Sequence, residues 1–224
     1  MRPTVLLFDI DGTLISTDGA GRRAFTRAIT ERTGRPDACD FSFAGMTDRA
    51  IARKALEAAG LPVTTADIDA TIDAYLELLD HELRTAACRV HEGIAAALDA
   101  AAATDSAIGL GTGNVRAGAR LKLGRVGLHE RFAFGGFGCD SELRHEVLRA
   151  GAERGAAALG APVAECRVVV IGDTPKDIAA AQAIGAESIA VATGQYQVPD
   201  LAACRPTWAF EHLAADGALR ALLG

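Results

Sequence analysis

The stretch that decides the fold lies near the start of the chain and reads VLLFDIDGTL at residues 5–14. The run from Thr4 to Phe8 has the apolar character of a strand buried on both faces of a parallel sheet. The run ends in two acids, Asp9 and Asp11. Because a buried, unpaired carboxylate is costly, we expect both beyond the strand's carboxyl end, where open α/β sheets bind ligands. An Asp-Gly pair is also common in ordinary turns, so this stretch alone leaves a turn or a helix cap open.

Composition indicates a globular chain of one domain or two small ones. Half of the 224 residues are hydrophobic and 23% are charged, enough for a sizeable core. The net charge of −6 argues against a nucleic-acid partner. The five cysteines form no C-x-x-C pair, the start carries no signal-peptide pattern, and no apolar run is long enough to cross a membrane. We therefore expect a cytoplasmic protein with no membrane partner, and the sequence indicates no oligomeric state.

The remaining periodicity divides the chain into two kinds of segment. Residues 15–91 contain no convincing strand, and helical spacing predicts helices at 22–31, 48–59 and 65–83. From residue 92 the patterns alternate, with strands at 106–110, 131–137, 167–171, 188–192 and 207–210 and helices at 94–103, 115–126, 142–159, 178–184 and 213–223. Such alternation predicts a parallel, Rossmann-like α/β sheet flanked by helices. We predict an α/β core domain at 1–15 and 92–224, with an all-helical domain inserted at 16–91.

Polar loops follow three of the apolar strands, at the residues after Phe8, Leu110 and Ile171. Because the carboxyl ends of parallel strands lie at one edge of a sheet, we expect these loops to meet. They carry Asp9, Asp11, Thr112, Asn114, Asp173 and Asp177. Such an oxygen-rich set of side chains suits Mg²⁺.

These loops resemble motifs of the haloacid dehalogenase superfamily. DIDGTL at 9–14 is similar to its first motif, Thr112 in GTGN at 111–114 to its second, and GDTPKD at 172–177 to its fourth. The inserted helices occupy the place of this family's cap domain. The resemblance, to the phosphoglycolate phosphatase-like and β-phosphoglucomutase-like branch, implies a Mg²⁺-dependent phosphatase. Its substrate would be a small organic phosphate monoester, cleaved through an aspartyl-phosphate intermediate.

The resemblance also implies a role for each motif residue. Asp9 would be the nucleophile, and Asp11 the general acid for the leaving alcohol and then the base for water. Thr112 would hydrogen-bond the transferring phosphoryl oxygens. Asp9, Asp173 and the main-chain carbonyl of Asp11 would hold Mg²⁺, with Asp177 binding it through water or orienting its ligands. An acid at position 11 favours phosphate esters over the carbon–halogen bonds that the dehalogenating branch cleaves.

The third motif departs from the family pattern. It usually supplies a lysine, but no lysine occurs between Gly138 and Arg167. We predict that Arg144 replaces it, neutralising Asp9 and the phosphate, although arginine is not a simple substitute for lysine. Lys176 is a second candidate and Lys122 a weaker one.

Substrate contacts are predicted on both parts of the chain. Arg22 and Arg49 lie on cap segments that could face the site, and anionic substrates favour arginine, although solvated helix charge is an equal alternative. The full predicted set of substrate-binding residues is Thr112, Gly113, Asn114, Arg144, Lys176, Arg22 and Arg49. The expected partner is a small phosphorylated metabolite, with phosphoglycolate as the family-level choice.

Three alternatives remain open at this point. Within the family, a sugar-phosphate mutase of the β-phosphoglucomutase type shares the acid pair and the cap. A dinucleotide-binding module is suggested by GLGTG at 109–113, but Asn114 and Arg116 prevent a complete G-x-G-x-x-G. A receiver-type phospho-signalling domain also clusters acids, but it is much shorter and has no place for the helical insert.

Overall fold

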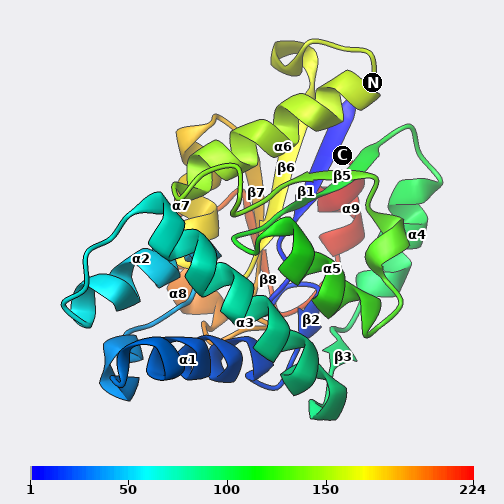
Figure 1. Ribbon diagram of the computed structural model, residues 1–224. Coiled ribbons are helices and arrows are strands. Elements are labelled where there is room, and N and C mark those ends of the chain that lie inside the picture. The colour runs from blue at the N-terminus through cyan, green and yellow to red at the C-terminus, as the bar shows by residue number, and fades with distance from the viewer. Residues whose placement is uncertain (1) are drawn as a thin grey trace.

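A six-stranded parallel sheet forms the centre of the protein in a computed structural model that describes residues 2–224. Its strand order is β5-β4-β1-β6-β7-β8. The strands are β1 (Thr4–Phe8), β4 (Ala107–Gly111), β5 (Phe134–Gly136), β6 (Arg167–Gly172), β7 (Glu187–Val191) and β8 (Trp208–Phe210). The first strand lies centrally, between β4 and β6, and is fully buried as its apolar sequence predicts (Figure 1). The predicted α/β fold with a parallel sheet is therefore confirmed.

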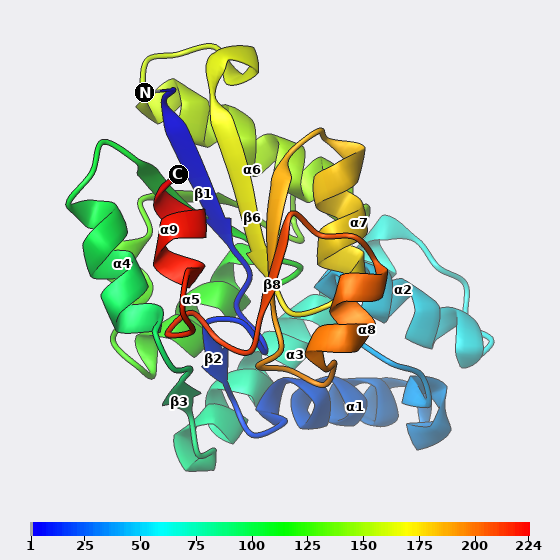
Figure 2. The ribbon, with the colours of Figure 1, turned by 180° about the vertical axis from the view of Figure 1, so that it is seen from behind.

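Helices cover both faces of the sheet (Figures 1 and 2). Alternate residues of β1 point to opposite faces, so Val5 and Leu7 pack with α6 and α7, whereas Leu6 and Phe8 pack with α4, α5 and α9. The helices are α4 (Ile94–Ala102), α5 (Arg116–Gly124), α6 (Arg144–Ala158), α7 (Pro175–Ala183), α8 (Val198–Ala203) and α9 (Ala218–Leu223). Both sides of the central strands are thereby removed from water.

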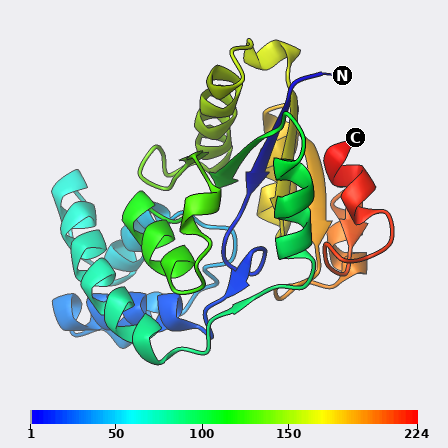
Figure 3. The ribbon, with the colours of Figure 1, turned by 90° about the vertical axis from the view of Figure 1, so that its right-hand side faces the viewer.

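The inserted segment contains α1 (Ala20–Thr33), α2 (Asp48–Ala58) and α3 (Thr65–Thr85). These three helices lie beyond the carboxyl ends of the strands (Figure 3). They have an apolar cluster of their own, in which the rings of Phe25 and Tyr75 stack with centroids 4.1 Å apart. We call residues 16–91 the cap, keeping the predicted boundaries, which remain a prediction.

The structure differs from the predicted elements in a few places. Residues 15–91 were predicted without strands, but β2 (Ile15–Ser16) and β3 (Arg89–Val90) pair antiparallel at the two ends of the insert. The helix α8 was not predicted, and β5 and α9 are shorter than expected. Two-residue strands and six-residue helices are too short to show a periodicity. Within residues 2–224, no helix has the length and apolar character needed to cross a membrane.

Close approach of α6 to the sheet depends on Gly136 in β5. A Cβ at this position would overlap the carbonyl oxygen of Val147 and lie 3.0 Å from the backbone nitrogen of Gly151, both in α6. The helix therefore rests on the strand without a side chain between them. This contact sets how α6 lies against β5, and with it the position of Arg144, the first residue of the helix.

We predict that Gly136→Ala destabilises the protein by at least the 1–3 kcal/mol, approximately, that overpacking usually costs, because the clash is with backbone. Gly124→Ala is the matched control, since a Cβ there meets nothing within 4 Å. It should leave stability unchanged or raise it by up to about 1 kcal/mol, because glycine is a poor helix former. Denaturant unfolding of both variants measures the difference; equal stabilities would contradict the proposed close contact.

Candidate active site

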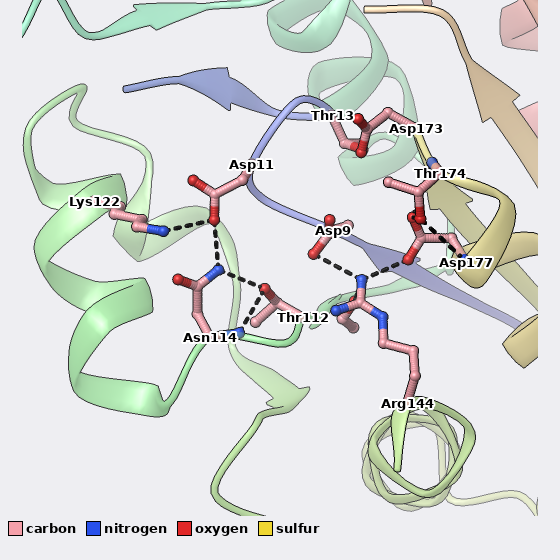
Figure 4. A network of polar contacts seen from close by, with 11 residues as sticks. Asp9, Asp11, Thr13, Thr112, Asn114, Lys122, Arg144, Asp173, Thr174 and Asp177 are labelled. Atoms are coloured by element: carbon pink, nitrogen blue, oxygen red, sulfur yellow. Dashed lines mark hydrogen bonds and ion pairs between the residues drawn. The ribbon is translucent and has the colours of Figure 1, made fainter. Parts of the chain in front are cut away.

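Three buried carboxylates meet where β1 and β6 end. Asp9 follows β1, Asp173 follows β6, and Asp177 lies in the first turn of α7. Their side chains offer carboxylate oxygens that all lie within 4.8 Å of one another (Figure 4). Because all donors are oxygens, this cluster fits a hard divalent cation such as Mg²⁺.

The orientation of Asp177 follows from the start of α7. Thr174 caps the helix, and its hydroxyl accepts a hydrogen bond from the Asp177 backbone N–H at 3.3 Å. In return, Asp177 Oδ2 accepts from the Thr174 N–H at 3.1 Å and from its hydroxyl at 2.7 Å, which completes a capping box. With Oδ2 engaged, Oδ1 is left to face Arg144.

Arg144 is buried between two of the carboxylates. Its Nη2 lies 2.9 Å from Asp9 Oδ1 and 2.6 Å from Asp177 Oδ1, and it also donates to the carbonyl oxygen of Gly111 at 3.2 Å. Lys176, the alternative to Arg144 in the sequence, is exposed and does not line the cavity described below. The structure thus places Arg144, rather than Lys176, against Asp9.

Burial raises the pKa of two of the carboxyls. Desolvation raises the pKa of Asp9 to about 6, although the nearby Arg144 acts in the opposite direction. Desolvation, followed by the charges of Asp177 and Asp9, raises the pKa of Asp173 to about 9. A cation bound by these groups would offset the repulsion and displace their protons.

Asp11 occupies a different environment from Asp9. Its Oδ2 accepts hydrogen bonds from Lys122 Nζ at 2.6 Å and from Asn114 Nδ2 at 2.8 Å, and 43% of its side chain is exposed. The carboxylate of Asp11 lies outside the cluster of three. Asp11 is a predicted metal ligand through its main-chain carbonyl, and this stays a prediction. Lys122, a weaker candidate for the missing third-motif lysine, contacts Asp11 instead of Asp9.

The second-motif loop connects Asp11 to the sheet. The Thr112 hydroxyl is buried and accepts hydrogen bonds from the Asn114 backbone N–H at 3.2 Å and from Asn114 Nδ2 at 2.9 Å. A Cβ on Gly113 would overlap the carbonyl oxygen of Met46, so only glycine lets the cap approach this loop. The loop therefore contacts Asp11 through Asn114 and the cap through Gly113.

A cavity of about 550 Å³ lies between the strand ends and the cap. It is lined by Asp9, Asp11, Arg22, Gly113, Asn114, Arg144 and Asp173 among the predicted site residues, and also by Phe43, Met46, Tyr75 and Lys122. The predicted substrate contacts of Arg49 and Lys176 find no support, because neither lines the cavity, and Arg49 pairs with Asp69 of α3. Thr112 lies behind the lining residues, with its side chain fully buried.

The sequence analysis missed Asp48, the first residue of α2. Its backbone N–H donates to the Gly113 carbonyl at 2.8 Å, and its Oδ2 accepts from the Val115 N–H at 2.8 Å. Burial raises the pKa of Asp48 to about 7. Nearby, Arg53 makes a bidentate ion pair with Glu142, at 2.7 and 2.9 Å. The Thr-Asp pair at 47–48 is a helix-start signature, but nothing in it indicates a partner in the core.

Solved structures of other proteins share this fold. No curated protein matches the sequence significantly. Among solved structures, a predicted phosphatase from Clostridium acetobutylicum superposes with a TM-score of 0.72 at 16% identity, covering 100% of this chain and 99% of that one. A predicted phosphoglycolate phosphatase from Haemophilus somnus gives 0.71 at 16%, covering 99% and 98%. CbbY from Rhodobacter sphaeroides, in complex with phosphate, gives 0.72 at 17%, covering 98% and 100%.

At these identities the structural likenesses show the fold alone. The family assignment comes from the sequence, because the model of the haloacid dehalogenase-like hydrolases matches residues 6–191. That range contains the end of β1 with Asp9, the cap, the second-motif loop, Arg144 and the start of α7, and therefore the acids and basic residues of the site described above. The chain belongs to the haloacid dehalogenase-like hydrolase family.

Proposed function

We propose that the protein is a Mg²⁺-dependent phosphatase that hydrolyses a small organic phosphate monoester through an aspartyl-phosphate. The observation that carries the proposal is the separation of two carboxylates that line one cavity. Asp9 is buried against Arg144 inside the cation-binding cluster, whereas Asp11 is half-exposed and held by Lys122 and Asn114. Two acids in such different environments suit the two roles of nucleophile and acid–base.

In this mechanism a carboxylate oxygen of Asp9 attacks phosphorus, the Asp9 O–P bond forms and the ester P–O bond breaks. Asp11 gives a proton to the leaving alcohol and later takes one from the water that attacks the aspartyl-phosphate. That attack breaks the Asp9 O–P bond, releases inorganic phosphate and restores the Asp9 carboxylate. Arg144 stabilises the negative charge of the phosphoryl group beside Asp9. Asp9, Asp173 and the Asp11 carbonyl would hold Mg²⁺, with Asp177 binding it through water or orienting its ligands, and the ion would supply positive charge that stabilises the phosphoryl oxygens.

The size and lining of the cavity support a small substrate. About 550 Å³ lies in the range of small-molecule sites, and part of that volume must hold the phosphate and Mg²⁺. The cap contributes apolar Phe43 and Met46 together with Arg22, whose guanidinium lies 4.4 Å from the Phe43 ring centroid. We propose phosphoglycolate, or a phosphorylated metabolite of similar size, as the substrate. The resemblance in fold between this protein and a predicted phosphoglycolate phosphatase supports this choice.

A screen of phosphorylated metabolites with detection of released inorganic phosphate tests the proposed function. We expect Mg²⁺-dependent release from phosphoglycolate or another small monoester. Asp9→Asn should abolish turnover and keep the fold, because the side chain lies beyond β1. Near-normal kcat in Asp9→Asn would contradict the mechanism. Isomerisation of a hexose phosphate with little phosphate release would indicate the mutase instead.

Mg²⁺ binding should strengthen as pH rises. In the metal-free protein Asp173 keeps its proton up to about pH 9, and Asp9 up to about pH 6, so bound Mg²⁺ must displace protons at lower pH. In the unfolded chain both carboxyls have the ordinary aspartate pKa of 3.8. Between pH 3.8 and the raised pKa the native state therefore binds more protons, so the free energy of unfolding of the metal-free protein falls as pH rises. The increase in Tm caused by Mg²⁺ should therefore grow between pH 6 and pH 9.

The matched control for this measurement is Asp173→Asn, which removes the group with the higher pKa while keeping its shape. We expect the Tm increase caused by Mg²⁺ to shrink and to lose most of its pH dependence in this variant. An increase that is constant with pH in the wild-type protein would argue against metal binding at these carboxylates.

Arg144 should contribute far more to turnover than Lys176. Loss of a fixed charge from a preorganised site costs on the order of 10²-fold or more in kcat, so we expect at least this loss for Arg144→Ala. Lys176→Ala should change kcat by less than about twofold, because the side chain is exposed and lies outside the cavity. Steady-state kinetics at saturating Mg²⁺ measure both, and the reverse order of effects would transfer the role to Lys176.

A further inference from the structure

Lys122 is the one buried lysine of three, since Lys54 and Lys176 are exposed. It lies in the last turn of α5, its side chain is 5% exposed, and it lines the cavity. A buried ammonium is unfavourable unless it is paired, and the carboxylate that pairs with it is Asp11, at 2.6 Å. In the mechanism above, Lys122 takes no part in a bond-forming or proton-transfer step.

Lys122 and Asn114 hold the same oxygen of Asp11. Both donate to Oδ2, Lys122 from α5 and Asn114 from the loop after β4. Asn114 is fixed in turn by its hydrogen bond to Thr112 Oγ1 at 2.9 Å. Among residues 2–224, no hydrogen bond reaches the other oxygen, Oδ1, and Figure 4 shows the two dashed contacts converging on one atom. The carboxylate is thus held on one side and open on the other.

The cap approaches the ammonium closely at Gly21. A Cβ on Gly21, in the first turn of α1, would lie 3.2 Å from Lys122 Nζ and 3.8 Å from the Tyr75 hydroxyl. Tyr75 and Asp48 line the same cavity from the cap. The cap therefore encloses the ammonium and leaves Asp11 as its hydrogen-bond acceptor among the described residues.

On the basis of the proposed function, we propose that Lys122 is a positioning residue for Asp11. By holding Oδ2, Lys122 restricts rotation of the half-exposed carboxylate and keeps Oδ1 directed at the oxygen that exchanges a proton during the reaction. A misdirected acid loses rate even when the substrate still binds, so Lys122 should affect kcat more than KM. An ion pair with a structural role alone would change the free energy of unfolding and leave the kcat of the folded protein unchanged.

A double-mutant cycle with Lys122→Met and Asp11→Asn separates these two roles. The substrate is 4-nitrophenyl phosphate, whose leaving group needs little help from an acid, so Asp11→Asn keeps a measurable rate. Asp11 still acts as the base for the attacking water in the second step, so its loss or misdirection still lowers kcat with this substrate. In the wild-type background we expect Lys122→Met to lower kcat by about tenfold or more while KM changes by less than about threefold. In the Asp11→Asn background the same substitution should lower kcat by less than about twofold, because effects through a shared residue are not additive.

Lys54→Met is the matched control, because it removes the same charge from an exposed lysine next to the Phe41 ring. It should leave kcat and KM unchanged. Thermal unfolding of each variant shows that folded protein is compared. If Lys122→Met does not fold, Lys122→Arg keeps the charge but changes the geometry, and the same cycle applies to it.

Equal loss of kcat in both backgrounds, or no loss in either, would overturn the role proposed for Lys122. That outcome leaves the proposed function intact, provided that the wild-type protein releases phosphate. Absence of Mg²⁺-dependent phosphate release from every monoester by the wild-type protein would overturn the proposed function itself. The two failures are therefore distinguishable in one set of assays.

Discussion

The burial of three neighbouring acids, Asp9, Asp173 and Asp177, determines the electrostatics of the site. Their carboxylate oxygens lie within 4.8 Å of one another, and all three side chains are buried. Like charges this close, shielded from water, cannot all be ionised without positive charge nearby. Arg144 supplies one cation, in contact with Asp9 and Asp177. Among the described residues, Asp173 makes no such contact with a basic side chain, and its pKa of about 9 is higher than the value of about 6 for Asp9. A divalent cation bound beside Asp173 would therefore stabilise its ionised form the most.

The fold brings Arg144 to the cluster through backbone contacts. The close packing of Gly136 on α6 sets the start of that helix. The loop before it is held by Asp140, which accepts from the Phe137 N–H at 2.9 Å and pairs with Arg154 of α6 at 2.6 and 2.8 Å. The strand β5, the loop that follows it and α6 together position the backbone of Arg144 so that its side chain reaches Asp9.

The fold and the acid cluster could be predicted because both depend on local sequence. Acids directly after apolar strands must lie at one edge of a parallel sheet, whatever else the chain does. The directions of individual long side chains could not be predicted. Lys122 lies between two leucines on α5, and its partner Asp11 is 111 residues away. Arg49 and Lys176 carry the charge expected of substrate contacts, but neither lines the cavity.

The two basic residues beside the acids differ in a way that matches their tasks. The guanidinium of Arg144 contacts two carboxylates through Nη2, and Nη1 makes no hydrogen bond to residues 2–224, so it can serve a phosphoryl oxygen. The ammonium of Lys122 is a point charge that holds one oxygen of Asp11 and leaves the other open. The guanidinium of Arg144 therefore lies where the charges of two carboxylates must be balanced. The ammonium of Lys122 lies where a single carboxylate must be oriented. In the proposed mechanism, this difference lets two acids separated by one residue perform different steps.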